Sequence, residues 1–227
     1  MTVHFNDLTD TAGSTVVAEY QRSVSSGLYT NFLKRLLDIC FVLLVAPFAA
    51  IVIAAFALII ALDGHNPFYR QDRVGKDGRV FSMWKLRSMV ANADDILAAY
   101  LTLNPNAKAE WDRSQKLRVD PRITRIGSFI RKSSIDELPQ LFNVLVGDMS
   151  VVGPRPMMVS QQIIYPGTLY YKMRPGITGF WQVSDRNECE FPARAKYDDK
   201  YYREQSLATD VRVLGQTAVA VLRCTGY

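Results

Sequence analysis

The longest apolar run in the chain extends from Ile39 to Leu62 and contains no charged residue. At 1.5 Å per residue, a helix over this run would extend roughly 36 Å, enough to cross a hydrocarbon core of about 30 Å. Core helices of soluble proteins rarely carry apolar residues on every face, so the run predicts a membrane helix. Pro47 lies inside the run, where it removes a backbone hydrogen bond and bends a helix.

Basic residues flank this helix on both sides, with Lys34 and Arg35 before it and Arg70 and Arg73 after it. Basic flanks favour the cytoplasmic side of a membrane. A proline-bent, re-entrant helix that returns to the side from which it entered fits both flanks, and an ordinary span with a proline kink is the alternative. We therefore predict a flexible N-terminal tail at 1–27, a re-entrant membrane helix at 28–64 and a cytoplasmic domain at 65–227.

The rest of the chain alternates short elements with turns. Two β-leaning runs between Phe68 and Met89 surround Asp77-Gly78, a dipeptide typical of hairpin turns. Residues 92–116 have a helical pattern that is broken at Asn104-Pro105-Asn106, and two shorter segments follow at 123–131 and 135–145. The predicted fold class is α+β and helix-dominated: one long bent membrane helix, a small β-hairpin, and short helices that form the catalytic domain.

The last segment predicts an amphipathic helix, because its apolar residues recur at helical spacing. This stripe consists of Leu207, Val211, Leu214, Ala218 and Val221. Two interpretations remain open for it: the stripe lies at the membrane interface, or it packs on the core of the domain.

Composition and charge limit the function classes. The 227 residues are 48% hydrophobic and carry a net charge of +5, which suits nucleic acid, an anionic membrane surface or a phosphate-bearing substrate. No nucleic-acid-binding motif or dense basic stripe is present, so we expect no nucleic-acid partner. Three cysteines without paired spacing and two histidines indicate neither a disulfide framework nor a zinc site.

Two adjacent acids, Asp136 and Glu137, follow Ser134 and the cations Arg131 and Lys132. One interpretation is structural, because Ser134-x-x-Glu137 has the spacing of a helix capping box. The other is chemical. A carboxylate among cations and backbone donors at a helix start stays ionised, so it could act as a nucleophile or hold Mg²⁺ in phosphoryl chemistry.

Three long blocks then identify a family. They are YRQDRVGKDGRVFSMWKLRSM from Tyr69 to Met89, RVDPRITRIGSFIRKSSIDELPQLFNVLVGDMSVVGPRP from Arg118 to Pro156, and MRPGITGFWQVSDRN from Met173 to Asn187. With the preceding apolar run they resemble, in order, the bacterial sugar transferases. These are the monotopic polyprenyl-phosphate phosphoglycosyl transferases that start exopolysaccharide and glycan assembly. The chain is most similar to short, exopolysaccharide-type members without additional N-terminal spanning helices.

The resemblance implies a reaction. Asp136 would attack the β-phosphate of a UDP-sugar and form a covalent sugar-phosphate intermediate, with release of UMP. Undecaprenyl phosphate would then attack that intermediate to give undecaprenyl-diphospho-sugar. Glu137 would assist as a base or orient its neighbour, and Mg²⁺ bound at Asp136 would offset the charge of the diphosphate. Among short relatives the resemblance favours UDP-galactose or UDP-glucose, but the sequence does not identify the sugar.

The resemblance also implies partners and a location. Lys85, Arg87, Arg131 and Arg155 match cationic substrate-binding positions of the family. The expected location is the bacterial inner (cytoplasmic) membrane with the catalytic domain on the cytoplasmic face, and the oligomeric state, a homo-oligomer included, stays open. The alternative function is a non-catalytic, membrane-anchored basic scaffold protein, for which Asp136→Asn would be harmless.

Overall fold

The structure is a computed structural model that describes residues 27–114, 117–184 and 190–223. Apart from Gly27, the tail predicted at 1–27 lies outside the described residues. The dominant element is a π-helical turn, η1 (Tyr29–Leu33), that continues into α2 (Lys34–Ala61). Together they are long and apolar enough to cross a membrane, with a mean hydropathy of 2.9. The predicted long apolar helix is therefore confirmed, whereas its bend at Pro47 and its re-entrant path stay predictions.

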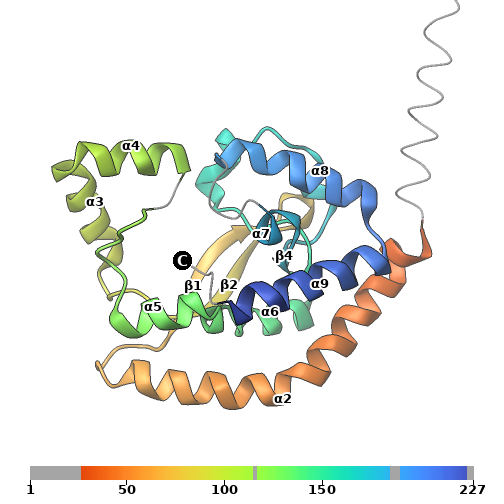
Figure 1. Cartoon of the computed structure of the whole chain (residues 1–227), viewed down its shortest axis with the longest axis horizontal. Helices are drawn as coiled ribbons and strands as arrows, with labels where there is room; N and C mark the ends of the chain where they lie inside the picture. The colour runs from red at the N-terminus through yellow and green to blue at the C-terminus, as the bar shows by residue number, and fades with distance from the viewer. Residues whose placement is uncertain (1–26, 115–116, 185–189, 224–227) are drawn as a thin grey trace, which may run out of the picture.

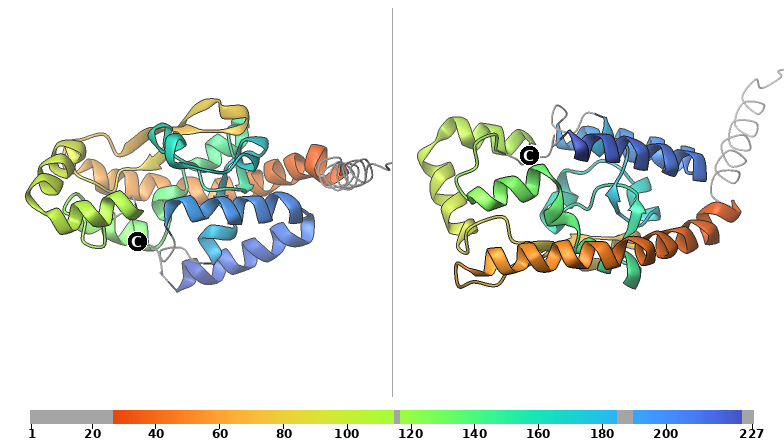
Figure 2. Two further views of the ribbon diagram at one scale, coloured as in Figure 1. Left: turned by 90° about the horizontal axis from the view of Figure 1, so that it is seen from above. Right: turned by 60° about the horizontal axis from the view of Figure 1, so that its bottom comes forward.

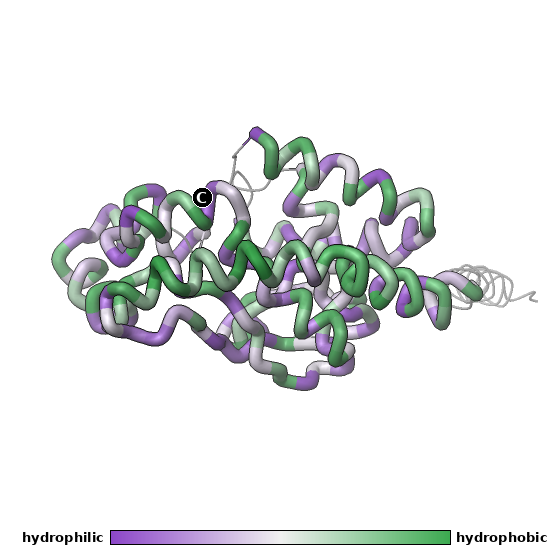
Figure 3. The backbone as a smooth tube through the Cα atoms, turned by 90° about the horizontal axis from the view of Figure 1, so that it is seen from below, coloured by the Kyte–Doolittle hydropathy of each residue, from purple (hydrophilic) through white to green (hydrophobic). Residues whose placement is uncertain are grey.

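Helix α2 lies along one side of the molecule, and the other elements are stacked above it in the view of Figure 1. Its inner face contributes Val42 and Ala49 to the main core. Its outer face is also apolar but exposed: Leu44 and Phe48 are each 71% exposed. Figure 3, which views the molecule from below, shows this apolar helix running across the face turned toward the reader. A long uncovered apolar face of this kind indicates contact with lipid or with another apolar surface.

The predicted hairpin is confirmed. Strands β1 (Phe68–Val74) and β2 (Val80–Leu86) pair antiparallel, with Phe68 opposite Leu86 and Val74 opposite Val80. The tip contains η2 (Lys76–Gly78), in which Asp77 and Gly78 have positive φ values of 58° and 75°. Asp and Gly tolerate this left-handed region better than most residues, which explains why this dipeptide turns the chain here.

Short helices build most of the remaining domain (Figures 1 and 2). The break predicted near Asn104-Pro105 is confirmed, because it separates the first two of these helices, which form an arm beside the domain. A second sheet of two parallel three-residue strands is too short to be recognised from sequence. The α-helices are α3 (Ala93–Leu103), α4 (Pro105–Ser114), α5 (Arg125–Lys132), α6 (Gln140–Val146), α7 (Phe180–Val183), α8 (Arg194–Glu204) and α9 (Leu207–Leu222). The shorter elements are η3 (Ile135–Glu137), β3 (Ser150–Val152), η4 (Val159–Ile164), η5 (Leu169–Lys172), β4 (Gly176–Thr178) and η6 (Phe191–Ala193).

The first turns of α2 are bonded to the rest of the domain. Near its start, Lys34 Nζ lies 2.7 Å from Asp210 Oδ2 of α9, and both residues are buried. Asp38 accepts hydrogen bonds from the Ser150 hydroxyl and the Val151 amide at the start of β3. The basic flank at Lys34 is thus a buried ion pair rather than a charge at the membrane surface.

The C-terminal helix α9 packs against the domain with a different face from the one that carries its apolar stripe. Thr209, Asp210 and Val213 are its buried residues. Leu207 and Val211 of the predicted stripe are 52% and 58% exposed. Packing of this stripe on the core is therefore wrong for these two residues, and its contact with a membrane interface stays a prediction.

Candidate active site

The two acids lie in a tight connection between helices. Helix α5 is capped by Thr124, whose hydroxyl accepts a hydrogen bond from the Gly127 amide, and it ends at Lys132. Ser134 then adopts the left-handed region with φ 58° and makes no side-chain cap hydrogen bond. The capping-box interpretation is therefore wrong. The left-handed residue instead turns the chain so that Asp136 and Glu137 follow in the short helix η3.

Buried apolar residues fix this connection. Ile130 of α5 is fully buried beside Leu86 of β2 and Ile60 of α2, and Ile135 packs against the same cluster. Since successive side chains of a strand point to opposite faces, burial of Leu86 directs its neighbour Lys85 the other way.

Lys85 contacts both acids. Its Nζ donates to Glu137 Oε1 at 2.8 Å and lies 3.7 Å from Asp136 Oδ2. Arg155 approaches from another segment, with its Nη2 3.6 Å from Glu137 Oε1. Two cations therefore converge on Glu137, whereas Asp136 is held by one longer contact. This leaves the Asp136 carboxylate as the less restrained of the two acids.

Burial opposes ionisation of Asp136, which is only 6% exposed. Desolvation raises the pKa of its carboxyl group, the charge of Lys85 lowers it, and the charge of Glu137 raises it again. The net direction is upward. The sequence interpretation, in which nearby cations simply keep this group ionised, omitted the cost of burial.

The other two cations predicted at the site, Arg131 and Arg87, lie in different places. Burial lowers the pKa of Arg131, and the charges of Asp136 and Asp120 oppose that shift, which places Arg131 within electrostatic reach of the dyad. Arg87 instead binds Asp63 just beyond α2, with its Nη2 2.6 Å from Asp63 Oδ1. The structure thus gathers Lys85, Arg131 and Arg155 around the acids, and Arg87 at the end of the membrane helix. A substrate-binding role for Arg87 stays a prediction.

The backbone beside Arg155 is held by close contact between two loops. The Gly176 amide donates to the Pro154 carbonyl at 2.8 Å. A Cβ atom at Gly176 would lie 2.1 Å from the Gly153 nitrogen, so no larger residue fits there without displacing the backbone. The Arg155 guanidinium lies 5.7 Å from the centre of the Trp181 ring. Trp181 is 3% exposed and therefore supports this arginine from within the core.

Asn143 of α6 connects the dyad segment to β2. Its side-chain oxygen accepts from the Trp84 amide at 3.0 Å, and its nitrogen donates to the Ser82 carbonyl at 2.9 Å. The side-chain amide of Asn143 thus makes the hydrogen bonds that a neighbouring strand would make along the free edge of β2. Because Lys85 follows Trp84, this pair of bonds fixes the lysine relative to the acids.

Sequence reasoning missed Arg73 as a site residue. Its Nη1 donates to the Pro156 carbonyl at 3.1 Å, and its Nη2 donates to the Gln71 side chain. Burial lowers its pKa to about 10, and the nearby positive charge of Arg155 contributes to the shift. Nothing in the sequence distinguishes Arg73 from Arg70 or Arg79 of the same hairpin, because its role depends on contacts with a distant loop.

The residues at the site could hold Mg²⁺ only together with oxygen atoms of the substrate. Among the described residues, no group of three or more His, Cys, Asp or Glu side chains could hold a metal ion. Mg²⁺ is commonly bound by one or two carboxylates together with substrate phosphates. Asp136, with the oxygens of a diphosphate, would satisfy that pattern.

The chain is similar to known proteins over most of its length. The family model described as "Bacterial sugar transferase" matches residues 29–224. The chain is 43% identical over 199 residues to an undecaprenyl-phosphate galactose phosphotransferase of Salmonella typhimurium, covering 87% of this chain and 42% of that protein. It is 40% identical over 177 residues to the exopolysaccharide production protein ExoY of Rhizobium meliloti, covering 75% of this chain and 78% of that protein.

A third relative is the UDP-glucose:undecaprenyl-phosphate glucose-1-phosphate transferase of Escherichia coli. It is 35% identical over 213 residues, covering 89% of this chain and 42% of that protein. The chain thus spans less than half the length of the galactose and glucose relatives. The match to the family model includes both acids and the cations around them, and it extends over most of the chain. The chain therefore belongs to the bacterial sugar transferase family.

Proposed function

We propose that the protein transfers a sugar-1-phosphate from a UDP-sugar to undecaprenyl phosphate. The observation that carries this proposal is the Asp136-Glu137 dyad, with Lys85 and Arg155 converging on it beside a long apolar helix. Cations that converge on carboxylates suit a substrate with several phosphate oxygens. The names of the galactose and glucose relatives support the acceptor, and UDP-galactose or UDP-glucose is the proposed donor.

The reaction would proceed in two displacements. A carboxylate oxygen of Asp136 attacks the β-phosphorus of the UDP-sugar, and the bond to the bridging oxygen breaks so that UMP leaves. A phosphate oxygen of undecaprenyl phosphate then attacks the same phosphorus and releases Asp136. A covalent nucleophile of this kind divides one transfer into two easier steps. Asp136 suits the role of nucleophile because Lys85 and Arg155 engage mainly its neighbour.

Glu137 and the cations prepare the site for this chemistry. Glu137 holds Lys85 and Arg155 close to Asp136, where both could bind phosphate oxygens as charge develops. Mg²⁺ bound through Asp136 and the diphosphate would supply additional positive charge.

The membrane position also belongs to this proposal. The exposed apolar face of α2 would lie in the bilayer, with the domain at the cytoplasmic surface, where nucleotide sugars are available. Because Lys34 and Asp38 near one end and Asp63 beyond the other are bonded to the same domain, both ends would lie on one side of the membrane. This arrangement supports a re-entrant rather than a spanning helix. It also allows the lipid substrate to approach along the bilayer surface.

The test is UMP release by the purified protein in detergent, with undecaprenyl phosphate, Mg²⁺ and a panel of UDP-sugars. We expect release with one preferred donor and a loss of at least about 10³-fold in Asp136→Asn, because a missing nucleophile removes the covalent route. Incubation with donor alone should increase the intact mass of the wild-type protein by one sugar-phosphate and leave that of Asp136→Asn unchanged.

The matched control is Asp95→Asn, since Asp95 is an exposed acid in the first turn of α3. This variant should retain wild-type activity and form the mass adduct. Full activity of Asp136→Asn would contradict the catalytic assignment and favour the scaffold alternative. Lipid-dependent UMP release without the mass adduct would contradict the covalent intermediate alone.

A further inference from the structure

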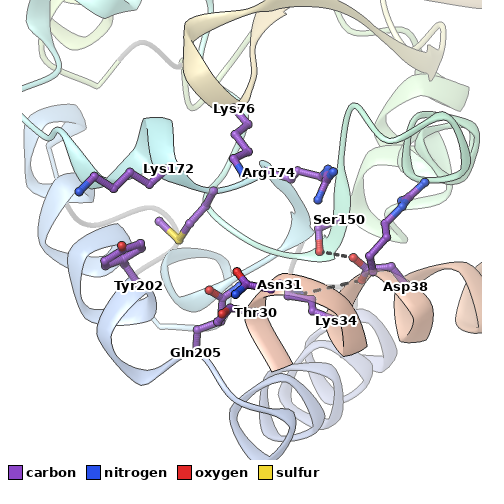
Figure 4. Close-up of a pocket in the computed structure, with 12 residues that line it drawn as sticks. Thr30, Asn31, Lys34, Asp38, Lys76, Ser150, Lys172, Arg174, Tyr202 and Gln205 are labelled. Carbon is purple, nitrogen blue, oxygen red and sulfur yellow. Dashed lines mark hydrogen bonds and ion pairs between the residues drawn. The ribbon is translucent and has the colours of Figure 1, made fainter. Parts of the chain in front are cut away.

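A second cationic site lies at the opposite end of α2 from the dyad. A pocket of about 190 Å³ is enclosed by η1, the first turns of α2, the hairpin tip, η5 and the end of α8 (Figure 4). Five cations and one carboxylate, that of Asp38, line it. The proposed transfer reaction at Asp136 does not account for this concentration of positive charge.

The pocket is separate from the dyad by two independent measures. Along α2, about 28 Å of helix axis separate Lys34 in the pocket from Ile53, which packs near the dyad segment. Along β2, roughly 17 Å of strand separate Val80, next to the hairpin tip, from Lys85. A sugar nucleotide at Asp136 would therefore leave the pocket free.

The negative groups nearby offset only part of the positive charge of the pocket. The Asp38 carboxylate lies 3.9 Å from Lys34 Nζ and accepts hydrogen bonds from Ser150 and Val151. Lys34 is paired with Asp210. Among the described residues, Lys76 and Lys172 have no ion-pair partner. In Figure 4 the Lys76 side chain points into the pocket from the hairpin tip, whereas the Lys172 side chain extends along the rim, with its Nζ 5.8 Å from the centre of the Tyr202 ring.

Two arginines add fixed positive charge. Arg35 donates to the Val144 and Leu145 carbonyls at 2.5 and 2.9 Å, and Arg174 donates to the Gly147 carbonyl through Nε at 2.9 Å. Carbonyl groups orient these side chains but carry only partial negative charge. The terminal nitrogens of Arg174 therefore remain available to an anion in the pocket.

The pocket is built partly from the first turns of the apolar helix α2, which supply Lys34, Arg35 and Asp38. A ligand that combines an anionic group with a hydrocarbon chain could place the anion among the cations and its chain along this apolar helix. Phosphate suits cations that approach from several elements, because its oxygens can accept from several donors at once.

We propose that this pocket binds a phosphate group, independently of the transfer reaction at Asp136. Because the pocket lies at the start of the apolar helix α2, the headgroup of an anionic membrane lipid is the favoured source, and a soluble phosphate is the other source. Binding at the start of α2 would hold this end of the helix at the membrane surface.

The test uses the full chain in detergent and two probes. Native mass spectrometry would count phosphatidylglycerol bound against phosphatidylcholine, and equilibrium dialysis would measure inorganic phosphate in the absence of lipid. The variant is Lys76→Glu/Lys172→Glu, which changes two exposed residues outside the catalytic site. The matched control is Lys108→Glu/Lys196→Glu, which changes the net charge equally at exposed positions outside the pocket lining.

We expect the pocket variant to bind the probe at least about tenfold more weakly, since two charge-assisted contacts are lost. The control and Lys76→Arg/Lys172→Arg should bind like the wild type. Selective binding of phosphatidylglycerol alone would identify a lipid headgroup, and binding of inorganic phosphate with the same lysine dependence would identify a site for the free group. Binding of neither probe, or equal losses in both glutamate variants, would overturn the proposal.

Discussion

At the scale of single residues, Asp198 of α8 shows how burial alters a side chain outside the dyad. It is 5% exposed, and its Oδ2 accepts a hydrogen bond of 2.5 Å from the Tyr165 hydroxyl. Burial raises the pKa of this carboxyl group to about 7. The Tyr165 hydrogen bond and the charge of Arg194 lower it, and the charge of Asp199 raises it.

This shift predicts a stability that depends on pH. Between about pH 4 and pH 7 the folded protein keeps the Asp198 proton, whereas the unfolded chain loses it. The contribution of Asp198 to the free energy of unfolding is therefore fully present below about pH 4 and is lost as the pH rises through 7. We expect the unfolding temperature to decrease between pH 5 and pH 8 by more in the wild type than in Asp198→Asn. Thermal unfolding followed by tryptophan fluorescence measures this difference, and equal decreases would contradict the role of Asp198.

The sequence located the acids but not their immediate partners. Asp136 and Glu137 were recognisable because adjacent acids follow two cations within a block that matches a family. The ion pair of Glu137 with Lys85 joins residues that are 52 positions apart, so it depends on the fold. Arg87 illustrates the same limit, since it lies two residues from Lys85 and yet binds Asp63. The raised pKa of Asp136 depends on burial, which neighbouring residues in the sequence do not reveal.

At the scale of elements, the contact between α6 and β2 determines the geometry of the dyad. Asn143 supplies both hydrogen bonds across this contact, to Trp84 and Ser82, and is 1% exposed. Removing its side chain would leave the Trp84 amide and the Ser82 carbonyl of β2, which are partly buried, without this partner. Lys85, the next residue in the strand, would then lose its fixed position.

Asn143→Ala should lower the free energy of unfolding by about 1–3 kcal/mol, because it removes two hydrogen bonds that each contribute about 0.5–1.5 kcal/mol. It should also reduce kcat more than it raises KM, because a displaced Lys85 affects the reacting groups more than donor binding. Chemical denaturation and steady-state UMP release measure these effects. Gln216→Ala, at an exposed position of α9, is the control and should change neither quantity. Loss of stability with unchanged kcat would contradict the positioning role.

Elements with strong local signals were predicted well. The apolar run gave α2, and Asp77-Gly78 gave the hairpin, because both signals are contained within a few neighbouring residues. The parallel pair β3 and β4 was missed, since three-residue strands that pair across the chain have no periodicity to detect. The apolar stripe of α9 was recognised from the sequence, but the face that the helix buries was not. Asp210 pairs with Lys34, so a partly polar face of α9 packs against the domain.

At the scale of the whole molecule, α2 and the domain form one unit. The helix is bonded to α9 near its start, contributes Val42 and Ala49 to the core, and ends beside Asp63, which binds Arg87. A simple span would move one of these ends across the bilayer and break its buried or ionic contacts. Breaking a buried ion pair by removing one partner costs about 3–5 kcal/mol. The contacts of the folded domain therefore favour insertion of the outer face of α2 from one side.

This arrangement predicts that both ends of α2 face the cytoplasm. Gly27→Cys and His65→Cys would each be placed in a chain whose three native cysteines, Cys40, Cys189 and Cys224, are replaced by serine. In intact bacterial cells a membrane-impermeant maleimide should label neither position, and after permeabilisation it should label both. Lys108→Cys on α4 serves as the marker for the domain and should behave in the same way. Labelling of a single end in intact cells would establish a span, and labelling of both ends would place the re-entrant helix and its domain on the outer face. Protection of both ends and the domain marker until permeabilisation is the pattern expected of a re-entrant helix whose domain meets the UDP-sugar and the lipid phosphate on the cytoplasmic side.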